Sequence, residues 1–160
     1  MIRVGIGYDA HRFAEGIPLI LGGVEIPWPK GLAAHSDGDV VIHAIIDSIL
    51  GAAALGDIGI HFPDSDPGYK GISSLLLLDE VREKITRVGY RVCNVDCTVV
   101  AQRPKISPHA PMMRKKISDA LSVEEGRINV KATTTEHMGF TGREEGIACY
   151  AICCIESLLS

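Results

Sequence analysis

The 160-residue sequence lacks the features that mark membrane, secreted and nucleic-acid-binding chains. It contains no apolar run of the roughly 20 residues that a helix needs to cross a bilayer. Its formal net charge is −4, so it has no excess of positive charge for nucleic acid or an anionic membrane. No basic stretch precedes an apolar one at the N-terminus, so a signal peptide is not expected. We therefore expect a cytoplasmic protein, or a plastid protein if a transit segment was removed, that binds neither nucleic acid nor membranes.

Paired cysteine motifs are also missing. The cysteine count is odd and no C-x-x-C spacing occurs; the five are Cys93, Cys97, Cys149, Cys153 and Cys154. This pattern disfavours a disulfide framework or a thiolate metal site, and the residues are better interpreted as small apolar side chains in a reducing compartment.

The sequence that is present predicts a single domain over residues 1–160. Apolar residues make up 46% and charged residues 22%, with no repeat or linker, so the chain is long enough to bury a core. Alternation of Ile2, Val4 and Ile6 predicts a half-buried strand, and the Gly22-Gly23 pair predicts the turn of a β-hairpin over 17–26. Periodicity predicts helices over 37–55, 73–88 and 107–121 and strands over 91–101, 128–132 and 147–158.

This element order is typical of an α+β protein. We expect a two-layer sandwich with helices on one face of a mixed four-stranded sheet, plus a small β-hairpin. The other face of the sheet then needs a cover. Because Asn94 and Asp96 lie on one face of a predicted strand, a subunit interface is a reasonable cover.

Three residues could form a metal site. Asp9 and His11 are two positions apart on a predicted strand, so their side chains leave the same face, and His43 falls in the first turns of a predicted helix. One oxygen and two nitrogens with a vacant fourth position describe a catalytic zinc. The alternative is a hydrogen-bonded Asp9–His11 pair without metal. His35 is a further imidazole, whose simpler roles are helix capping or support of the metal ligands.

A second group of polar residues follows the strand over 128–132. Hydroxyls and backbone N–H groups over 133–135 suit phosphate oxygens, and Glu136 suits magnesium. A threonine run that simply ends a strand is an equal alternative. Arg103, Lys105 and Arg143 could neutralise phosphate charge or could be solvated surface residues. The loop over 56–71 is too irregular for regular structure and is either functional or mobile. Together these features indicate metal-assisted phosphoryl chemistry without naming a substrate.

Several short motifs, in order from residue 3 to about 155, carry a family resemblance. The chain resembles the 2-C-methyl-D-erythritol 2,4-cyclodiphosphate synthases through GYDAHRF at 7–13, HSDGD at 35–39 with His43, GDIG at 56–59, FPDSD at 62–66, AQ-x-PK at 101–105, TTTE at 133–136 and GFTGR at 139–143. The resemblance implies cyclisation of 4-diphosphocytidyl-2-C-methyl-D-erythritol 2-phosphate, with release of CMP, in the non-mevalonate isoprenoid pathway. It also implies a homotrimer with active sites between subunits.

By this likeness Asp9, His11 and His43 bind one zinc ion per subunit, and Glu136 binds magnesium or manganese with the substrate diphosphate. His35 and Thr134 are the implied catalytic residues. The implied substrate contacts are Asp9, His11, His35, Ser36, Asp57, Ile58, Gly59, Phe62, Pro63, Asp64, Ser65, Asp66, Ala101, Gln102, Arg103, Pro104, Lys105, Ile106, Ser107, Thr133, Thr134, Thr135, Glu136, Phe140 and Arg143. An isoprenoid diphosphate in a cavity on the trimer axis is a further implied ligand.

Two other functional interpretations compete with this one. A zinc hydrolase of phosphate esters would use a zinc-bound water, but the sequence shows no clear general base beside the metal ligands. A metal-stabilised oligomeric binding module would fill the fourth zinc position with a protein side chain.

Overall fold

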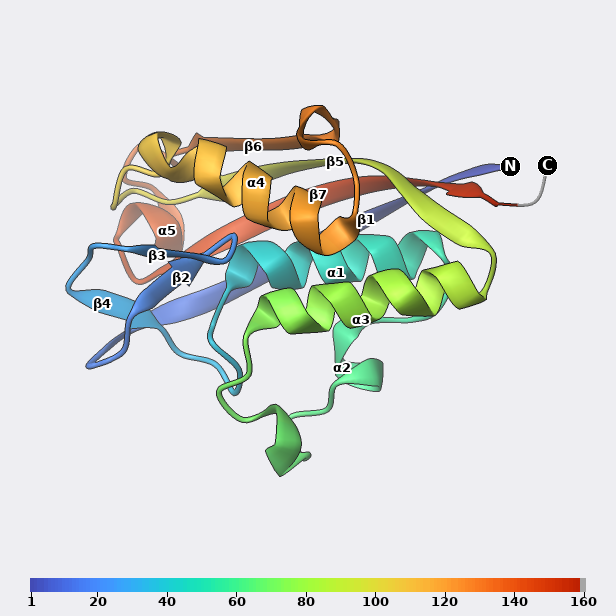
Figure 1. Cartoon of the computed structure of the whole chain (residues 1–160). Helices are drawn as coiled ribbons and strands as arrows, with labels where there is room; N and C mark the ends of the chain where they lie inside the picture. The colour runs from blue at the N-terminus through green and yellow to red at the C-terminus, as the bar shows by residue number, and fades with distance from the viewer. Residues whose placement is uncertain (159–160) are drawn as a thin grey trace.

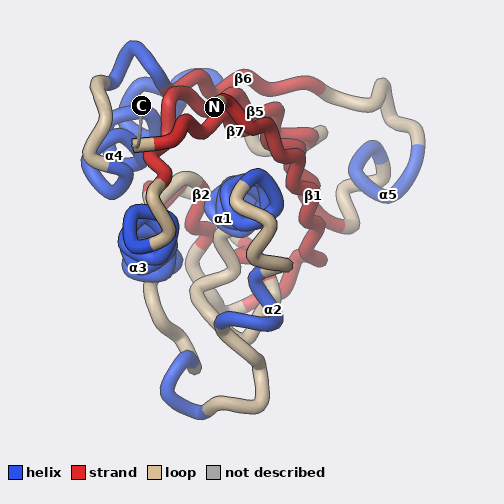
Figure 2. The backbone as a smooth tube through the Cα atoms, turned by 90° about the vertical axis from the view of Figure 1, so that its right-hand side faces the viewer, coloured by secondary structure: helices blue, strands red, loops and turns tan. Residues whose placement is uncertain are grey.

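The computed structural model describes residues 1–158, so the last two residues of the predicted domain lie outside it. Helices cover one face of a sheet, as Figures 1 and 2 show. Within the described residues the sheet has the order β4-β1-β7-β5-β6, and β2 pairs with β3 as a separate hairpin. The strands are β1 (Ile2–Glu15), β2 (Leu19–Leu21), β3 (Val24–Ile26), β4 (Lys30–Leu32), β5 (Tyr90–Val100), β6 (Ile128–Thr133) and β7 (Gly146–Ser157).

Three long helices form the second layer. These are α1 (Val40–Ala52), α3 (Ser74–Arg87) and α4 (Ala110–Leu121), and α1 packs along β1 and β7 (Figure 1). Short turns of helix complete the chain: α2 (Ile58–His61), α5 (Gly139–Gly142), and the 3₁₀ turns η1 (Pro67–Tyr69), η2 (Ser107–His109) and η3 (Glu125–Arg127). No helix of the described chain is both long enough and apolar enough to span a membrane.

The predicted α+β class, mixed sheet and hairpin are confirmed, but the prediction of four strands is wrong. Strand β1 continues well beyond Ile6, and its last residues pair with β4, for example Phe13 with Leu32. Strand β5 pairs antiparallel with β7 and parallel with β6, which makes the sheet mixed. Because β4 is three residues long and directly follows a Pro-Trp-Pro segment, the sequence pattern there indicated a chain break rather than a fifth strand.

Two glycines of β1 allow α1 to lie directly against the strand backbone. A Cβ atom at Gly7 would overlap the carbonyl oxygen of Ala44, and one at Gly5 would overlap that of Ser48. The face of β1 that carries these glycines is therefore the face covered by the helix. This close approach brings the N-terminal turn of α1, and with it His43, beside Asp9 and His11.

The opposite face of β1 is apolar and uncovered. Ile2, Val4 and Ile6, which the alternation predicted to be half-buried, are each about two-thirds exposed at 68%, 66% and 68%. Tyr8 continues this face and packs against Tyr150 of β7, with ring centroids 4.8 Å apart and ring planes tilted by 48°. Alternation shows which residues of β1 share a face, but it does not show which face α1 covers. The positions of Gly5 and Gly7 determine that face. This side of the sheet is therefore exposed in the single chain, and its cover by another subunit stays a prediction.

The interior contains the cysteines as free thiols. Cys97, Cys149 and Cys153 are buried and Cys93 and Cys154 are half-buried, in agreement with the interpretation of small apolar side chains. The core lies between the sheet and α1, α3 and α4, and includes Ile45, Ile49, Leu78 and Ile117.

Candidate active site

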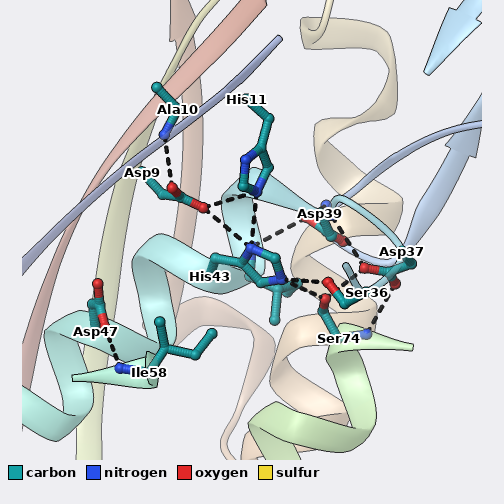
Figure 3. A network of polar contacts seen from close by, with 12 residues as sticks. Asp9, Ala10, His11, Ser36, Asp37, Asp39, His43, Asp47, Ile58 and Ser74 are labelled. Carbon is teal, nitrogen blue, oxygen red and sulfur yellow. Dashed lines mark hydrogen bonds and ion pairs between the residues drawn. The ribbon is translucent and has the colours of Figure 1, made fainter. Parts of the chain in front are cut away.

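Asp9, His11 and His43 converge on one point, as predicted (Figure 3). Asp9 Oδ2 lies 3.0 Å from His11 Nε2 and 3.1 Å from His43 Nδ1, and the two ring nitrogens are 3.0 Å apart. Ligands of a tetrahedral zinc with bonds of about 2.0–2.1 Å are separated by about 3.3 Å, so this triangle needs to open by only about 0.3 Å. Within residues 1–158 no other group of three such side chains meets the same spacing. The donor set and its geometry therefore fit a divalent metal.

Asp9 and His43 shift each other's pKa values in opposite directions. Burial raises the pKa of Asp9, but the hydrogen bonds and charges of His11 and His43 outweigh burial and hold this pKa well below its ordinary value. Burial lowers the pKa of His43, but the hydrogen bond and charge of Asp9, with the more distant Asp39 and Asp37, raise it overall. Asp9 is thus held in its ionised form, which is the form that binds a cation.

The N-terminus of α1 holds His43 in place. Asp39 is completely buried and caps the helix, with Oδ1 accepting from the backbone N–H of Ile42. The same carboxylate accepts from Gly22 N and Gly23 N at the hairpin turn. The predicted helix over 37–55 is present, and Asp39 is its cap. The hairpin and the metal ligand are therefore joined through one side chain.

The far side of the His43 ring faces hydroxyl groups. His43 Nε2 lies 2.9 Å from Ser74 Oγ and 3.0 Å from Ser36 Oγ (Figure 3). Ser74 in turn donates to Asp37, with 2.5 Å between Oγ and Oδ1. Sequence reasoning missed both Ser74 and this use of Asp37, because the two residues are distant in the chain. The sequence predicted only a helix over 73–88, and Ser74 is the first residue of the observed helix.

A cavity of about 540 Å³ opens beside the three ligands. Ten predicted site residues lie on its wall: Asp9, His11, His35, Ser36, His43, Ile58, Gly59, Phe62, Pro63 and Asp64. Tyr69, which was not predicted, also lies there and meets the Phe62 ring edge-on at 5.4 Å. No described cysteine, aspartate or glutamate besides Asp9 and Asp64 lines this cavity, so the wall leaves room for a ligand next to the metal position.

The segment over 56–71 contains the helical turns α2 and η1, contrary to the prediction that it has no regular structure. Asp57 caps α2 by accepting from Ile60 N, and Asp66 caps η1 by accepting from Gly68 N. Short aspartate-capped turns have no apolar periodicity, so the sequence could not reveal them. His35 Nε2 contacts the Asp66 carbonyl oxygen at 3.2 Å, which links the two sides of the cavity mouth. His35 therefore neither caps α1 nor supports His43. Ser65 does not line the cavity.

The second predicted group gathers at the ends of β5 and β6. Because these strands are parallel, their C-terminal ends meet, and Ala101 N donates to Thr133 O at 3.0 Å. Thr134 is exposed and its Oγ1 lies 3.4 Å from a carboxylate oxygen of Glu136. The backbone of Glu136 has a φ of 51°, an uncommon value for a side chain other than Gly or Asn. Gln102 and His137 close the group through a 3.1 Å bond from His137 N.

A pocket of about 360 Å³ lies beneath this group. Its wall includes Ile106, Ser107, Lys131 and Ala132, with Ala110, Pro111, Arg114 and Val130 behind. Pro104 is buried, whereas Lys105 is exposed. The remaining predicted basic residues have carboxylate neighbours: Arg103 lies 3.6 Å from Glu144, and Arg143 lies 3.2 Å from Glu145.

Within one chain, the metal ligands and the residues at the end of β6 lie apart. Asp9 is level with Cys149 of β7, Val99 of β5 and Ala132 of β6, so three strand spacings separate the metal ligands from the end of β6. Three spacings amount to about 14 Å. Phe140 of α5 is an exception, because it lines a separate cavity with His11 and Arg12. Thr134 and Glu136 therefore do not line the cavity beside His43 within their own chain.

The fold and the carboxylate–imidazole cluster at a cavity define a metal-dependent α+β enzyme. A profile of the YgbB family matches residues 2–156, and the chain belongs to this family. A relative from Agathobacter rectalis, named 2-C-methyl-D-erythritol 2,4-cyclodiphosphate synthase, is 56% identical over 157 residues, which cover 98% of this chain and 89% of the relative. A relative of the same name from Clostridium botulinum is 55% identical over 155 residues, 97% of this chain and 100% of the relative. The predicted resemblance is confirmed.

Solved structures agree with this family. The bifunctional IspDF from Campylobacter jejuni superposes with a TM-score of 0.95 at 45% identity, covering 98% of this chain and 42% of that protein. This chain thus spans less than half of the bifunctional protein. IspF from Plasmodium falciparum, in a CDP complex, superposes with a TM-score of 0.85 at 39% identity, covering 98% of this chain and 96% of that one.

Proposed function

We propose that the protein converts 4-diphosphocytidyl-2-C-methyl-D-erythritol 2-phosphate into 2-C-methyl-D-erythritol 2,4-cyclodiphosphate and CMP. The observation that carries this proposal is the Asp9–His11–His43 triangle on the wall of a cavity, in a chain 56% identical to a relative named for this synthesis. Asp64, Ile58 and Gly59 on the same wall are proposed to contact the methylerythritol part. The activity is a phosphorus–oxygen lyase reaction of the non-mevalonate isoprenoid pathway.

The active site is proposed to lie between subunits of a homotrimer. Two observations support this arrangement. The apolar face of Ile2, Val4, Ile6 and Tyr8 is large and uncovered in the single chain, which is typical of an interface. The metal ligands and the Thr134–Glu136 group are about 14 Å apart in one chain, which supports a site to which a neighbouring chain supplies one of them. An isoprenoid diphosphate on the trimer axis, near Arg143, and a cytoplasmic location stay predictions.

The residues of this chain supply positioning rather than a strong base. The substrate's own 2-phosphate is already ionised, so it attacks the β-phosphorus without a protein base, and CMP leaves. The Thr134 hydroxyl is proposed to donate to a phosphate oxygen as charge moves in the transition state, with Glu136 beside it. His35, held by the Asp66 carbonyl, is proposed to orient the reacting phosphate at the cavity mouth. Zinc at Asp9, His11 and His43 and magnesium or manganese at Glu136 would stabilise phosphate charge when bound.

The cytidine is proposed to occupy the pocket beneath β6. Ile106 and Ala132 on its wall offer apolar contact and Ser107 offers a hydroxyl, and the preceding loop over 101–105 is proposed to supply backbone hydrogen-bonding groups. The Plasmodium falciparum structure contains CDP, which is the nucleotide part of this substrate. Phe140 and Arg143 are proposed to close the site from the loop that follows Glu136.

The proposal is tested by incubating the zinc- and magnesium-loaded protein with the cytidine diphosphate substrate and recording phosphorus NMR spectra. We expect equal amounts of CMP and a cyclic diphosphate. An open-chain phosphate product with water incorporated would instead identify a zinc hydrolase, and an unchanged substrate would identify a binding module.

A further inference from the structure

The two nitrogens of His43 have different surroundings. Nδ1 faces Asp9 and His11 at the metal position, whereas Nε2 faces Ser74 Oγ at 2.9 Å and Ser36 Oγ at 3.0 Å (Figure 3). His43 is 8% exposed and Ser74 is completely buried. The protein, rather than bulk water, therefore determines which nitrogen carries the proton.

The hydrogen bonds of Asp37 fix the direction of this network. Its Oδ1 accepts from Ser74 Oγ and from Asp39 N, and its Oδ2 accepts from Ser74 N at 2.9 Å. A carboxylate that receives these donors has no proton to give. The single hydroxyl proton of Ser74 therefore points to Asp37, and the Ser74 oxygen is left with lone pairs only toward His43.

It follows that the bond between His43 and Ser74 needs an N–H on His43 Nε2. A lone pair at that position would face a lone pair of Ser74 at 2.9 Å, which is repulsive. A metal that replaces the hydrogen bond between Nδ1 and Asp9 would find the proton on Nε2 and the lone pair of the neutral ring on Nδ1, the nitrogen that faces Asp9 and His11. This is the tautomer that a metal ligand requires.

We propose that Ser74 and Asp37 are positioning residues that hold His43 as the Nε2–H tautomer and aim Nδ1 at the metal. This inference rests on the proposed function, because it takes Asp9, His11 and His43 as the metal ligands. Since Ser74 begins α3 and Asp37 binds its backbone N–H as well, the start of α3 and the orientation of the His43 ring are set together. Ser36 offers a second acceptor to the same N–H from the cavity side.

The decisive experiment measures zinc affinity by competition with a chelator of known affinity. Partners of metal-bound histidines typically contribute 10- to 100-fold to affinity, so Ser74→Ala is expected to weaken zinc binding by about that factor. Ser118→Ala is the matched control, because Ser118 is also a buried helical serine but donates to Lys115 O in α4. It is expected to leave zinc affinity within about twofold. Equal zinc affinities of the Ser74→Ala and unaltered proteins would overturn the inference.

A second measurement uses the unaltered protein, so it does not depend on the folding of a variant. In the zinc-loaded protein, nitrogen NMR is expected to place the His43 proton on Nε2, with slow exchange because its acceptor is buried. A proton on Nδ1, or zinc on Nε2, would overturn the inference. The proposed function fails by a different result: no zinc binding by the unaltered protein, or unchanged zinc binding by His43→Ala, would refute the metal site itself.

Discussion

The metal ligands and the Thr134–Glu136 group differ in how completely a single chain builds them. The ligands come from a strand and a helix start, are at most about a quarter exposed, and every polar atom around His43 has a partner. Thr134 and Glu136 are exposed in a loop, where they hydrogen-bond to each other. The metal ligands are already arranged to bind a metal in the single chain. The Thr134–Glu136 group, in our proposal, is completed only by substrate and a neighbouring chain.

This difference separates two sources of catalytic power. Buried ligands on rigid elements keep their geometry without substrate, as charge stabilisation by preorganised groups requires. Exposed hydroxyls on a loop gain their effect only when water is replaced by substrate and, in our proposal, by a neighbouring chain. Damage to the first group should therefore abolish metal binding, while damage to the second should lower turnover and leave the metal in place.

The largest expected effect is that of His43→Ala. Removing one of the three ligands should eliminate zinc binding and lower kcat/KM by about a thousandfold or more, because several kcal/mol of charge stabilisation are lost. Zinc content and turnover would be measured together, with His109→Ala as a control on a histidine outside both groups. Full turnover by zinc-free His43→Ala protein would contradict this role.

Gly7→Ala tests whether the close approach of β1 and α1 sets the metal geometry. The added methyl group would overlap the Ala44 carbonyl, so we expect about 3 kcal/mol lower stability and weaker zinc binding. Gly126→Ala is the control, since its Cβ would meet nothing within 4 Å. Denaturant unfolding and zinc titration measure the two effects. Equal stability and equal zinc affinity of the Gly7 and Gly126 variants would show that the contact between β1 and α1 does not set the metal geometry.

Thr134→Ala should have the smallest effect of the three and a different character. Loss of a transition-state donor should lower kcat by about a hundredfold and change KM much less, with zinc affinity unchanged. Steady-state kinetics beside Thr86→Ala, an exposed threonine of α3, measure this. An unaltered kcat would refute the assignment of Thr134 to the transition state. A loss of zinc binding would contradict the claim that the Thr134 group acts independently of the metal site.

Much of the fold and of the metal site could be predicted from local pattern. The two-residue spacing of Asp9 and His11 and the cap before His43 are short-range signals, and the structure confirms that these side chains meet. The role of Ser74 could not be predicted, because its contacts with Asp37 and His43 join positions 37 and 31 residues apart. The exposure of Ile2, Val4 and Ile6 follows from the packing of α1 on the opposite face of β1. Gly5 and Gly7 on that face were the sequence feature that could have indicated it.

The most direct test of the two-group account is to mix two inactive proteins. His43→Ala chains keep the Thr134 group, and Thr134→Ala chains keep the metal ligands. If each site is shared between neighbouring subunits, unfolding and reassembling an equal mixture should restore about one quarter of the unaltered activity, the fraction of sites that receive both intact groups in a random trimer. Activity no higher than the mean of the two separate variants would contradict the account, since each chain would then have to hold a whole site by itself.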